Sequence, residues 1–411
     1  MQDRVSLYPG RVKLVPVAGQ ENTYDMVRAD SPTQKGMPLD KANLLSDDAE
    51  IALFGVANDR TVSEAFTGIG SKLKLIMSDM ASITVTVTDQ AGNAVKNALV
   101  EGIYSDSGSA VYTNASGVAS GYISEGNQII SVKNYADLED ISKTLTVVKG
   151  ATIVETLTPT RVNFVKLTAS KSVKFSGNVK TVDVTVVGGG GAAGTSYASQ
   201  ESPSVAATGG SGAGGYCIVQ DNIQITPNTP CPTVIGSGGT TTYSDGNDGG
   251  KSSFLGVEAA GGKGGKAATY SAAGAGQAGN GNGVYGRIVD KYSTGDHSGN
   301  DGNPGTVDGY DSFTTTTRFG GSGGSGGASN SSSTSGGNPG GYGGKGGGVE
   351  RTNGVSGDAG KDGFGGGGGS GGAFFASYGT DDPEQDKGNP GKGGSGCVTM
   401  RIHFDFGDLS A

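Results

Sequence analysis

Glycine fills two of every three positions in several tracts of this chain, and that spacing limits the fold more than any other feature. The chain has 411 residues, 79 of them glycine, and most of the glycines follow Val187. The tract "GGYGGKGGG" at 340–348 places Tyr342 and Lys345 three residues apart. In a polyproline II helix, which has three residues per turn, such residues lie on one face and glycine lines the other two.

Three structures are compatible with these tracts. A flexible linker is one, but tracts such as 320–327 recur between strand-like runs that open and close a single segment. A collagen triple helix needs an unbroken, proline-rich Gly-X-Y repeat. An array of glycine helices of the polyglycine II type is the third, because bare faces let neighbouring backbones approach and hydrogen bond. We favour the ordered array; disorder, or a mixture of turns and β-arches, is the alternative.

The remaining sequence predicts a mainly β, multidomain protein. Residues 82–160 alternate apolar and polar side chains and turn at "DQAGN", "TNASG" and "SEGN", which predicts a β-sandwich. Residues 161–411 begin and end with strand-like runs such as "VKTVDVTVV" and "GCVTMRI". We expect the last run to return beside the first, which closes a second β-sandwich that contains the glycine helices.

The N-terminal part divides into an arm, residues 1–40, and a helical segment, residues 41–81. Asp40 and Thr61 are helix-start signals, and "TVSE" forms a capping box with Glu64. The second helix carries apolar residues at alternating spacings of four and three, which is typical of a coiled-coil seam. A helix packed within its own chain shows the same spacing. The predicted oligomerisation residues are Val62, Phe66, Ile69, Leu73, Ile76 and Met80.

No residue pattern indicates an enzyme, a cofactor or a metal site. The two histidines, His297 and His403, lie in unrelated contexts, and no catalytic constellation is spaced for chemistry. The acidic runs "TDDPEQDKG", "DGNDGG" and "DHSGNDGN" lack the ligand spacing of a calcium loop and are interpreted as solvated loops. Cys217, Cys231 and Cys397 are expected to be buried thiols. A disulfide between Cys217 and Cys231 is the alternative.

Charge and hydropathy limit the partners. The net charge of −9 is spread along the chain, which disfavours nucleic acid because phosphate binding needs clustered cations. The first residues do not form a signal peptide, and no run approaches the roughly 20 apolar residues that span a bilayer. We therefore expect synthesis in a cytoplasm and no membrane insertion.

Three longer inserts, 195–208, 284–320 and 373–387, interrupt the glycine tracts with aromatic and polar residues. Loops on a rigid scaffold are where binding residues concentrate. Aromatic rings can stack on sugar rings and Asp or Asn can bind hydroxyls; the alternative is that the aromatics plug the ends of the glycine helices. The candidate receptor-binding residues are Tyr285, Tyr292, Tyr310, Phe313, Phe319, Phe374, Phe375 and Tyr378.

Several motifs support a family resemblance. The runs "VDVTVVGGGGAAG", "TVIGSGG", "DGGKSSFLGVEAAGGKGG" and "GNPGKGGSGCVTMRI" resemble the glycine-rich domain of bacteriophage tail-fibre and adhesin proteins. The run from "YPGRVKLVPV" to "MPLDKANLL" resembles the N-terminal segment of phage proteins that attach fibres to the virion. Residues 82–160 resemble prealbumin-like and carboxypeptidase-regulatory-like Ig modules. Fibre adhesins can carry longer and more regular triplet arrays than this chain does.

The resemblance implies a fibrous homotrimer of the virion, made in the cytoplasm of the host bacterium. Its arm, residues 1–40, would dock on tail or baseplate proteins. Its Ig-like module, residues 82–160, would act as a spacer, and its tip, residues 161–411, would recognise a glycan or protein of the host surface. A non-adhesive spike, a head-decoration fibre or the fibre of a phage-tail-like bacteriocin are the alternatives. The sequence names neither the host, the receptor, the docking partner, a folding chaperone nor the oligomer number.

Overall fold

A computed structural model describes most of the chain from residue 80 onward and short pieces before it. The described residues are 5–6, 12–19, 21, 23–28, 32–34, 63–64, 66–67, 69, 80–105, 108–199, 204–290, 296–330, 333–350, 353–375 and 385–405. The chain forms two compact units. One comprises Met1–Ser82, Tyr122–Gly126 and Thr146–Thr152, and the other comprises Ile83–Gly121, Asn127–Leu145 and Ile153–Ala411.

The described N-terminal residues form two small antiparallel pairs. Strand β2 (Val12–Pro16) pairs with β3 (Tyr24–Arg28), and β1 (Val5–Ser6) pairs with β4 (Pro32–Gln34). The apolar side chains of the β2–β3 hairpin are exposed, because two strands alone have no second layer to bury them against. Residues 63–64, 66–67 and 69 are helical, as the capping box predicts.

The predicted coiled-coil seam lies mostly outside the described residues. Val62, Leu73 and Ile76 are not among them, whereas Phe66 is exposed and Ile69 and Met80 are half-buried. The seam and the trimer therefore stay predictions. Among the residues placed here, no helix has the length and apolar character that crossing a membrane requires.

Residues 81–157 contribute two small sheets. One has the order β6-β5-β9 and the other pairs β7 with β8. Side chains of β5 alternate between buried and half-buried along the whole strand, which is the period of two that the sequence predicts. The Ig-like assignment stays a prediction. The strands are β5 (Ala81–Val87), β6 (Val118–Ile123), β7 (Gly126–Val132), β8 (Ile141–Val147) and β9 (Thr152–Leu157).

Two four-stranded sheets, of order β10-β27-β12-β15 and β11-β16-β17-β18, share one apolar core. The C-terminal strand β27 returns to lie between β10 and β12, as the sequence predicts. Nearly every residue of β12 is buried, because neighbours cover both of its edges and both faces are packed. The strands are β10 (Phe164–Leu167), β11 (Lys171–Val173), β12 (Val179–Val187), β15 (Cys217–Gln224), β16 (Cys231–Val234), β17 (Ser252–Phe254), β18 (Val257–Ala259) and β27 (Cys397–Phe404).

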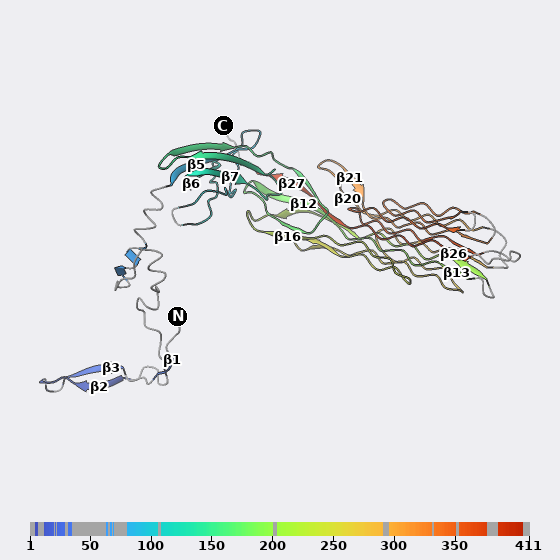
Figure 1. The fold of residues 1–411 in the computed structure, drawn as a ribbon, viewed down its shortest axis with the longest axis horizontal. Helices are drawn as coiled ribbons and strands as arrows, with labels where there is room; N and C mark the ends of the chain where they lie inside the picture. Colours follow the sequence, from blue (N-terminus) through green and yellow to red (C-terminus); the bar gives the residue numbers. More distant parts are fainter. Residues whose placement is uncertain are drawn as a thin grey trace. The chain divides into compact units, whose positions relative to one another are not determined.

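Beyond these sheets the chain continues into extended glycine segments, which we call rods (Figure 1). Backbone hydrogen bonds between rods repeat every three residues. The amides of Gly188, Gly191 and Gly194 donate to carbonyls within 210–216, each at 2.9 Å. The rod 188–195 bonds in this way to six neighbours, which contain residues 210–216, 244–250, 262–268, 391–394, Gly239 and Gly368.

The tract 340–348 begins with a turn at 341–342, and residues 343–348 form one of these rods. Its Gly344 and Gly347 amides donate to Gly367 and Ser370, each at 2.8 Å. A three-residue period with neighbours on all sides is the packing expected of polyproline-II-type glycine helices. The prediction of ordered, mutually hydrogen-bonded tracts is therefore confirmed for the described residues.

Short strands connect and cover the rods at several places. Sheet order β13-β14-β19 and sheet order β22-β25-β26 are three-stranded, while β20–β21 and β23–β24 are hairpins. Their bounds are β13 (Tyr197–Ser199), β14 (Val205–Ala207), β19 (Ile288–Asp290), β20 (Asp308–Tyr310), β21 (Thr316–Arg318), β22 (Ala328–Ser329), β23 (Val349–Glu350), β24 (Asn353–Gly354), β25 (Ala373–Phe375) and β26 (Gln385–Lys387).

Candidate functional site

The two three-stranded sheets, β13-β14-β19 and β22-β25-β26, pack against each other, and we call them the cap. Figure 1 shows β13 and β26 at the end of the rods that lies away from β16. Strands of the two sheets are in contact, β13 with β25 and β26, and β14 with β22 and β25. The cap therefore finishes the rod array at the end opposite the large sheets.

Strands from all three sequence inserts meet in the cap, although the β20–β21 hairpin of the insert 284–320 lies against the large sheets through β20. The insert 195–208 supplies β13 and β14, the insert 284–320 supplies β19, and the insert 373–387 supplies β25 and β26. A small buried cluster joins them, and it consists of Ala206, Val289, Ala328 and Ala373. Small side chains are needed there because the two sheets continue the close spacing of the rods. Segments almost 180 residues apart in the sequence thus become neighbours.

Two of the candidate aromatic residues are buried. Phe319 is fully buried in a cluster with Val187 and two cysteines, and its ring stacks on Phe364 with centroids 5.7 Å apart. Phe374 is also buried, in the cap. Neither side chain offers surface to a receptor. Both fit the alternative that aromatic rings supply the apolar mass that glycine lacks.

The other candidates do not form one site. Tyr285 is 65% exposed. Tyr310 lies near the large sheets, where its hydroxyl donates to Asp221 at 2.6 Å and its ring lies 3.6 Å from the guanidinium carbon of Arg401. Phe313 lies beside His403, with the centroids of the two rings 6.3 Å apart. Outside the described residues lie Tyr292, Tyr378 and the side chain of Phe375.

His403 has a structural partner. Its Nε2 lies 2.7 Å from Asp183, whose carboxylate also accepts Arg401 at 2.7 Å and the Asn222 amide at 2.8 Å. Burial works to raise the pKa of Asp183, but these hydrogen bonds outweigh it and hold that pKa below its usual value. The carboxylate therefore stays charged and ties β12, β15 and β27 together.

The cysteines are buried free thiols. Burial raises the pKa of Cys217 and of Cys397 to about 12, so neither is a reactive thiolate. The alternative that the sequence allowed, a Cys217–Cys231 disulfide, does not form. Across the described part of the chain, no group of three or more His, Cys, Asp or Glu side chains is arranged to hold a metal ion.

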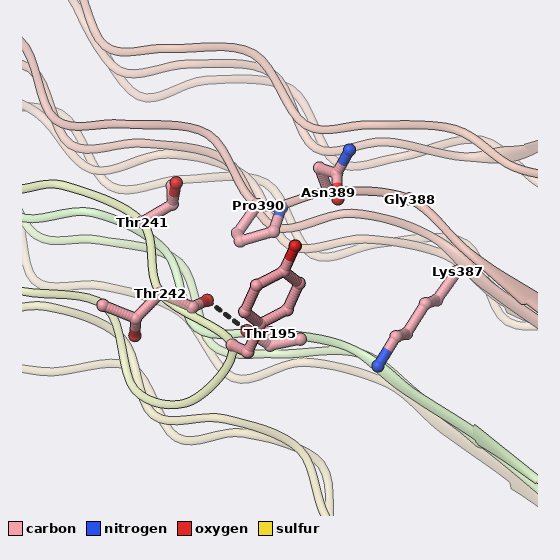
Figure 2. Close-up of a pocket in the computed structure, with 8 residues that line it drawn as sticks. Thr195, Thr241, Thr242, Lys387, Gly388, Asn389 and Pro390 are labelled. Atoms are coloured by element: carbon pink, nitrogen blue, oxygen red, sulfur yellow. Dashed lines mark hydrogen bonds between the residues drawn. The ribbon is translucent and has the colours of Figure 1, made fainter.

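A groove of about 590 Å³ lies beside the cap (Figure 2). This volume is within the range of roughly 300–1,000 Å³ that is usual for small-ligand sites. One wall comes from the loop 240–246 and the other from the residues that follow β26. The lining residues are Thr195, Thr241, Thr242, Tyr243, Lys387, Gly388, Asn389 and Pro390. We call it the Tyr243 groove, because Tyr243 is an aromatic side chain that is 97% exposed.

Hydrogen bonds hold the loop that carries Tyr243. The hydroxyl of Thr195 donates to the carbonyl of Thr242 at 2.7 Å and to that of Ser244 at 3.1 Å. Within the same loop, the hydroxyl of Thr242 donates to the carbonyl of Asp245 at 2.6 Å. The loop is thus fixed to the residue that precedes β13, while the tyrosine ring itself stays in solvent. Sequence reasoning missed this tyrosine, because it lies in a short tract and not in a long insert.

A ladder of charges on two adjacent rods was also missed. Lys263 pairs with Asp248 at 2.6 Å, and Lys266 pairs with Asp245 at 2.7 Å. Each carboxylate also accepts the backbone amide after its lysine, at 2.9 and 2.8 Å. The signal was present in "SDGNDGG" and "GGKGGKA", where like charges are three residues apart. Because the lysines and the aspartates both recur every three residues, each lysine of one rod faces one aspartate of the other. These ion pairs favour one alignment of the two rods along their length.

The packed rods and their covering sheets define a mainly β, glycine-rich protein. Residues 167–403, more than half of the chain, match the model of a family described as a glycine-rich domain, and the chain belongs to that family. No match to the chain was found among curated proteins. Among solved structures, the Bacillus anthracis TIE protein is similar at 18% identity over 26% of this chain and 22% of that chain, with a TM-score of 0.18. A likeness that small carries no argument about fold or function.

Proposed function

We propose that the chain is a receptor-binding protein of a bacteriophage tail fibre or baseplate. In this proposal the N-terminal residues attach to the particle, and the cap with the Tyr243 groove contacts the host-cell surface. The observation that carries the proposal is that strands from three long inserts meet at one end of the rod array. The resemblance of the glycine-rich segments to phage adhesins supports it.

The rods suit a scaffold that presents loops. Their amides are hydrogen bonded from rod to rod at every turn of the helix, so the loops at their ends start from a fixed backbone. A fixed loop loses less conformational freedom when it binds, which favours affinity.

The N-terminal hairpin suits attachment to another protein. Val12, Leu14, Val15 and Met26 of β2 and β3 are all exposed, and grouped exposed apolar side chains are typical of interaction sites. We propose a tail or baseplate protein as the partner, a homotrimer formed through the predicted seam, and a host glycan or surface protein as the receptor. Such a protein would be made in the bacterial cytoplasm and would act on the virion.

A cell-binding assay tests the proposal. The full chain, fluorescently labelled, is titrated onto a panel of bacteria with and without excess unlabelled chain. We expect saturable binding to at least one host, and the unlabelled chain should compete it away. Absence of saturable binding on every strain of the panel would contradict an adhesin and favour a non-adhesive spike or decoration fibre.

A further inference from the structure

The Tyr243 groove differs in charge from the rest of the molecule. The chain has 39 acidic residues and a net charge of −9. None of the described residues that line the groove is acidic, whereas Lys387 is cationic. An exposed lysine among these uncharged residues gives the described part of the groove a local positive potential, which favours an anionic ligand.

The nearest described carboxylates do not cancel that charge. Asp386 precedes Lys387 in β26, so its side chain points to the other face of the strand, and its Oδ1 accepts the Lys387 amide at 2.7 Å. Asp245 lies in the groove loop but is held by Lys266 at 2.7 Å. Among the ion pairs between described residues, none includes Lys387. Its ammonium group is therefore available to a ligand.

The uncharged lining residues match a sugar ring. Thr241 and Thr242 offer hydroxyls on one wall, and Asn389 offers an amide on the other, as Figure 2 shows. The Thr241 hydroxyl and the Asn389 amide can both donate and accept hydrogen bonds, as sugar hydroxyls do, whereas the Thr242 hydroxyl already donates to Asp245 and is left as an acceptor. Tyr243 adds an exposed ring with an apolar body and a polar tip. An apolar ligand would leave these polar groups unpaired, which disfavours it.

We infer that the Tyr243 groove binds a saccharide that carries an anionic group, with Lys387 as the partner of the anion and Tyr243 as the stacking surface. The inference deepens the proposed function and rests on it, since it names the class of receptor that this groove takes. A carboxylate of a sugar acid and a phosphate ester of a sugar share the required chemistry.

Ligand titration of the full chain tests the inference. The probes are D-glucuronic acid and glucose 6-phosphate, which carry the two kinds of anion, and D-glucose as the neutral reference, followed by ligand-observed NMR. We expect at least one anionic sugar to bind about threefold to fivefold more tightly than glucose, which is the gain typical of an exposed ion pair. The anionic sugar that shows this preference identifies the kind of anion that the groove binds. Salt at about 0.5 M should reduce the preference because it screens the charge of Lys387.

Two variants and a matched control assign the residues. Lys387→Gln should remove the preference for the anionic sugar and leave glucose binding unchanged. Tyr243→Ala should weaken binding of every sugar, and Tyr270→Ala, which removes another exposed tyrosine outside the groove, should weaken none. Both groove side chains are exposed, so the variants should unfold at the wild-type temperature.

The inference is overturned if no probe binds, if glucose binds as tightly as both anionic sugars, or if Lys387→Gln keeps the preference. Cell binding separates these failures from failure of the proposed function. If the Tyr243→Ala and Lys387→Gln chains still bind cells like the wild type, receptor binding stands and the groove inference fails. If the wild-type chain binds no cell at all, the proposed function itself fails.

Discussion

A methyl group added to one glycine in the middle of the rod array tests the packing directly. Gly190 lies in the rod 188–195 and is buried. A Cβ at this position would lie 2.0 Å from the carbonyl oxygen of Gly366 and 2.4 Å from its carbon. Ordinary contact begins at 3.4 Å, and both partners are backbone atoms that cannot rotate away. In Gly190→Ala the two rods must therefore separate.

The size of the effect follows from the hydrogen bonds at that contact. The Gly366 oxygen accepts the Gly394 amide at 2.7 Å, and the Gly191 oxygen accepts the Gly368 amide at 3.0 Å. A separation of this size breaks at least one of them, and each buried group left unpaired costs about 1–3 kcal/mol. Strain from overpacking costs about 1–3 kcal/mol. Together these costs should lower the free energy of unfolding of Gly190→Ala by ~2–6 kcal/mol.

Denaturant unfolding of the full chain measures the change, with Ala193→Gly as the matched control. Ala193 is three residues further along the same rod and is fully buried, so it matches Gly190 in its rod and its burial. Its loss of one methyl group creates no clash and should cost only about 1 kcal/mol. A loss below about 1 kcal/mol for Gly190→Ala, equal to the control, would refute the view that close backbone approach is why glycine fills the rods.

Three further predictions concern other parts of the chain. A hydrogen bond from the facing lysine is the main reason why the pKa of Asp245 lies below 3.8. A group whose pKa is depressed by folding contributes stability above its unfolded pKa, and that stability is lost as the pH falls through the folded pKa. Asp245→Asn should therefore lower the melting temperature slightly at pH 7, and this difference from the wild type should shrink as the pH is lowered below 3.8. Asp89 pairs with Arg161 at 2.6 Å, and both side chains are buried. Arg161→Met should lower the free energy of unfolding in urea by about 3–5 kcal/mol, because it leaves the Asp89 charge buried without its partner; a loss under about 1 kcal/mol would contradict this. Leu73→Asp with Ile76→Asp should lower the mass in solution if the seam joins chains; an unchanged mass would remove its assigned role.

Two features of the fold were predictable because they depend on local period. Strict alternation in residues 82–87 indicates a half-buried strand, and β5 has that burial pattern. Triplets such as "GGYGGKGGG" indicate a three-residue turn, and the rods hydrogen bond with that period. The return of β27 to β12 was also expected, because a strand-like run at each end of a domain needs a partner.

The candidate site was less predictable, because contact between distant segments has no local signal. The inserts 195–208 and 373–387 were identified as loops, yet only the sheet pairings show that they meet. The aromatic residues illustrate the same limit. Phe319 and Tyr243 are both flanked by polar or glycine residues, but one is fully buried and the other is 97% exposed.

The sequence by itself determined the local geometry of this protein. Glycine at two positions in three permits a helix of three residues per turn with two bare faces, and when such faces are buried their backbone groups must find hydrogen-bond partners. The tertiary structure alone decided which backbones those are, because rods of the same composition are interchangeable until charge ladders and covering sheets set their order. It also decided which aromatic rings fill the interior and which face solvent, since that depends on the position of each rod within the array.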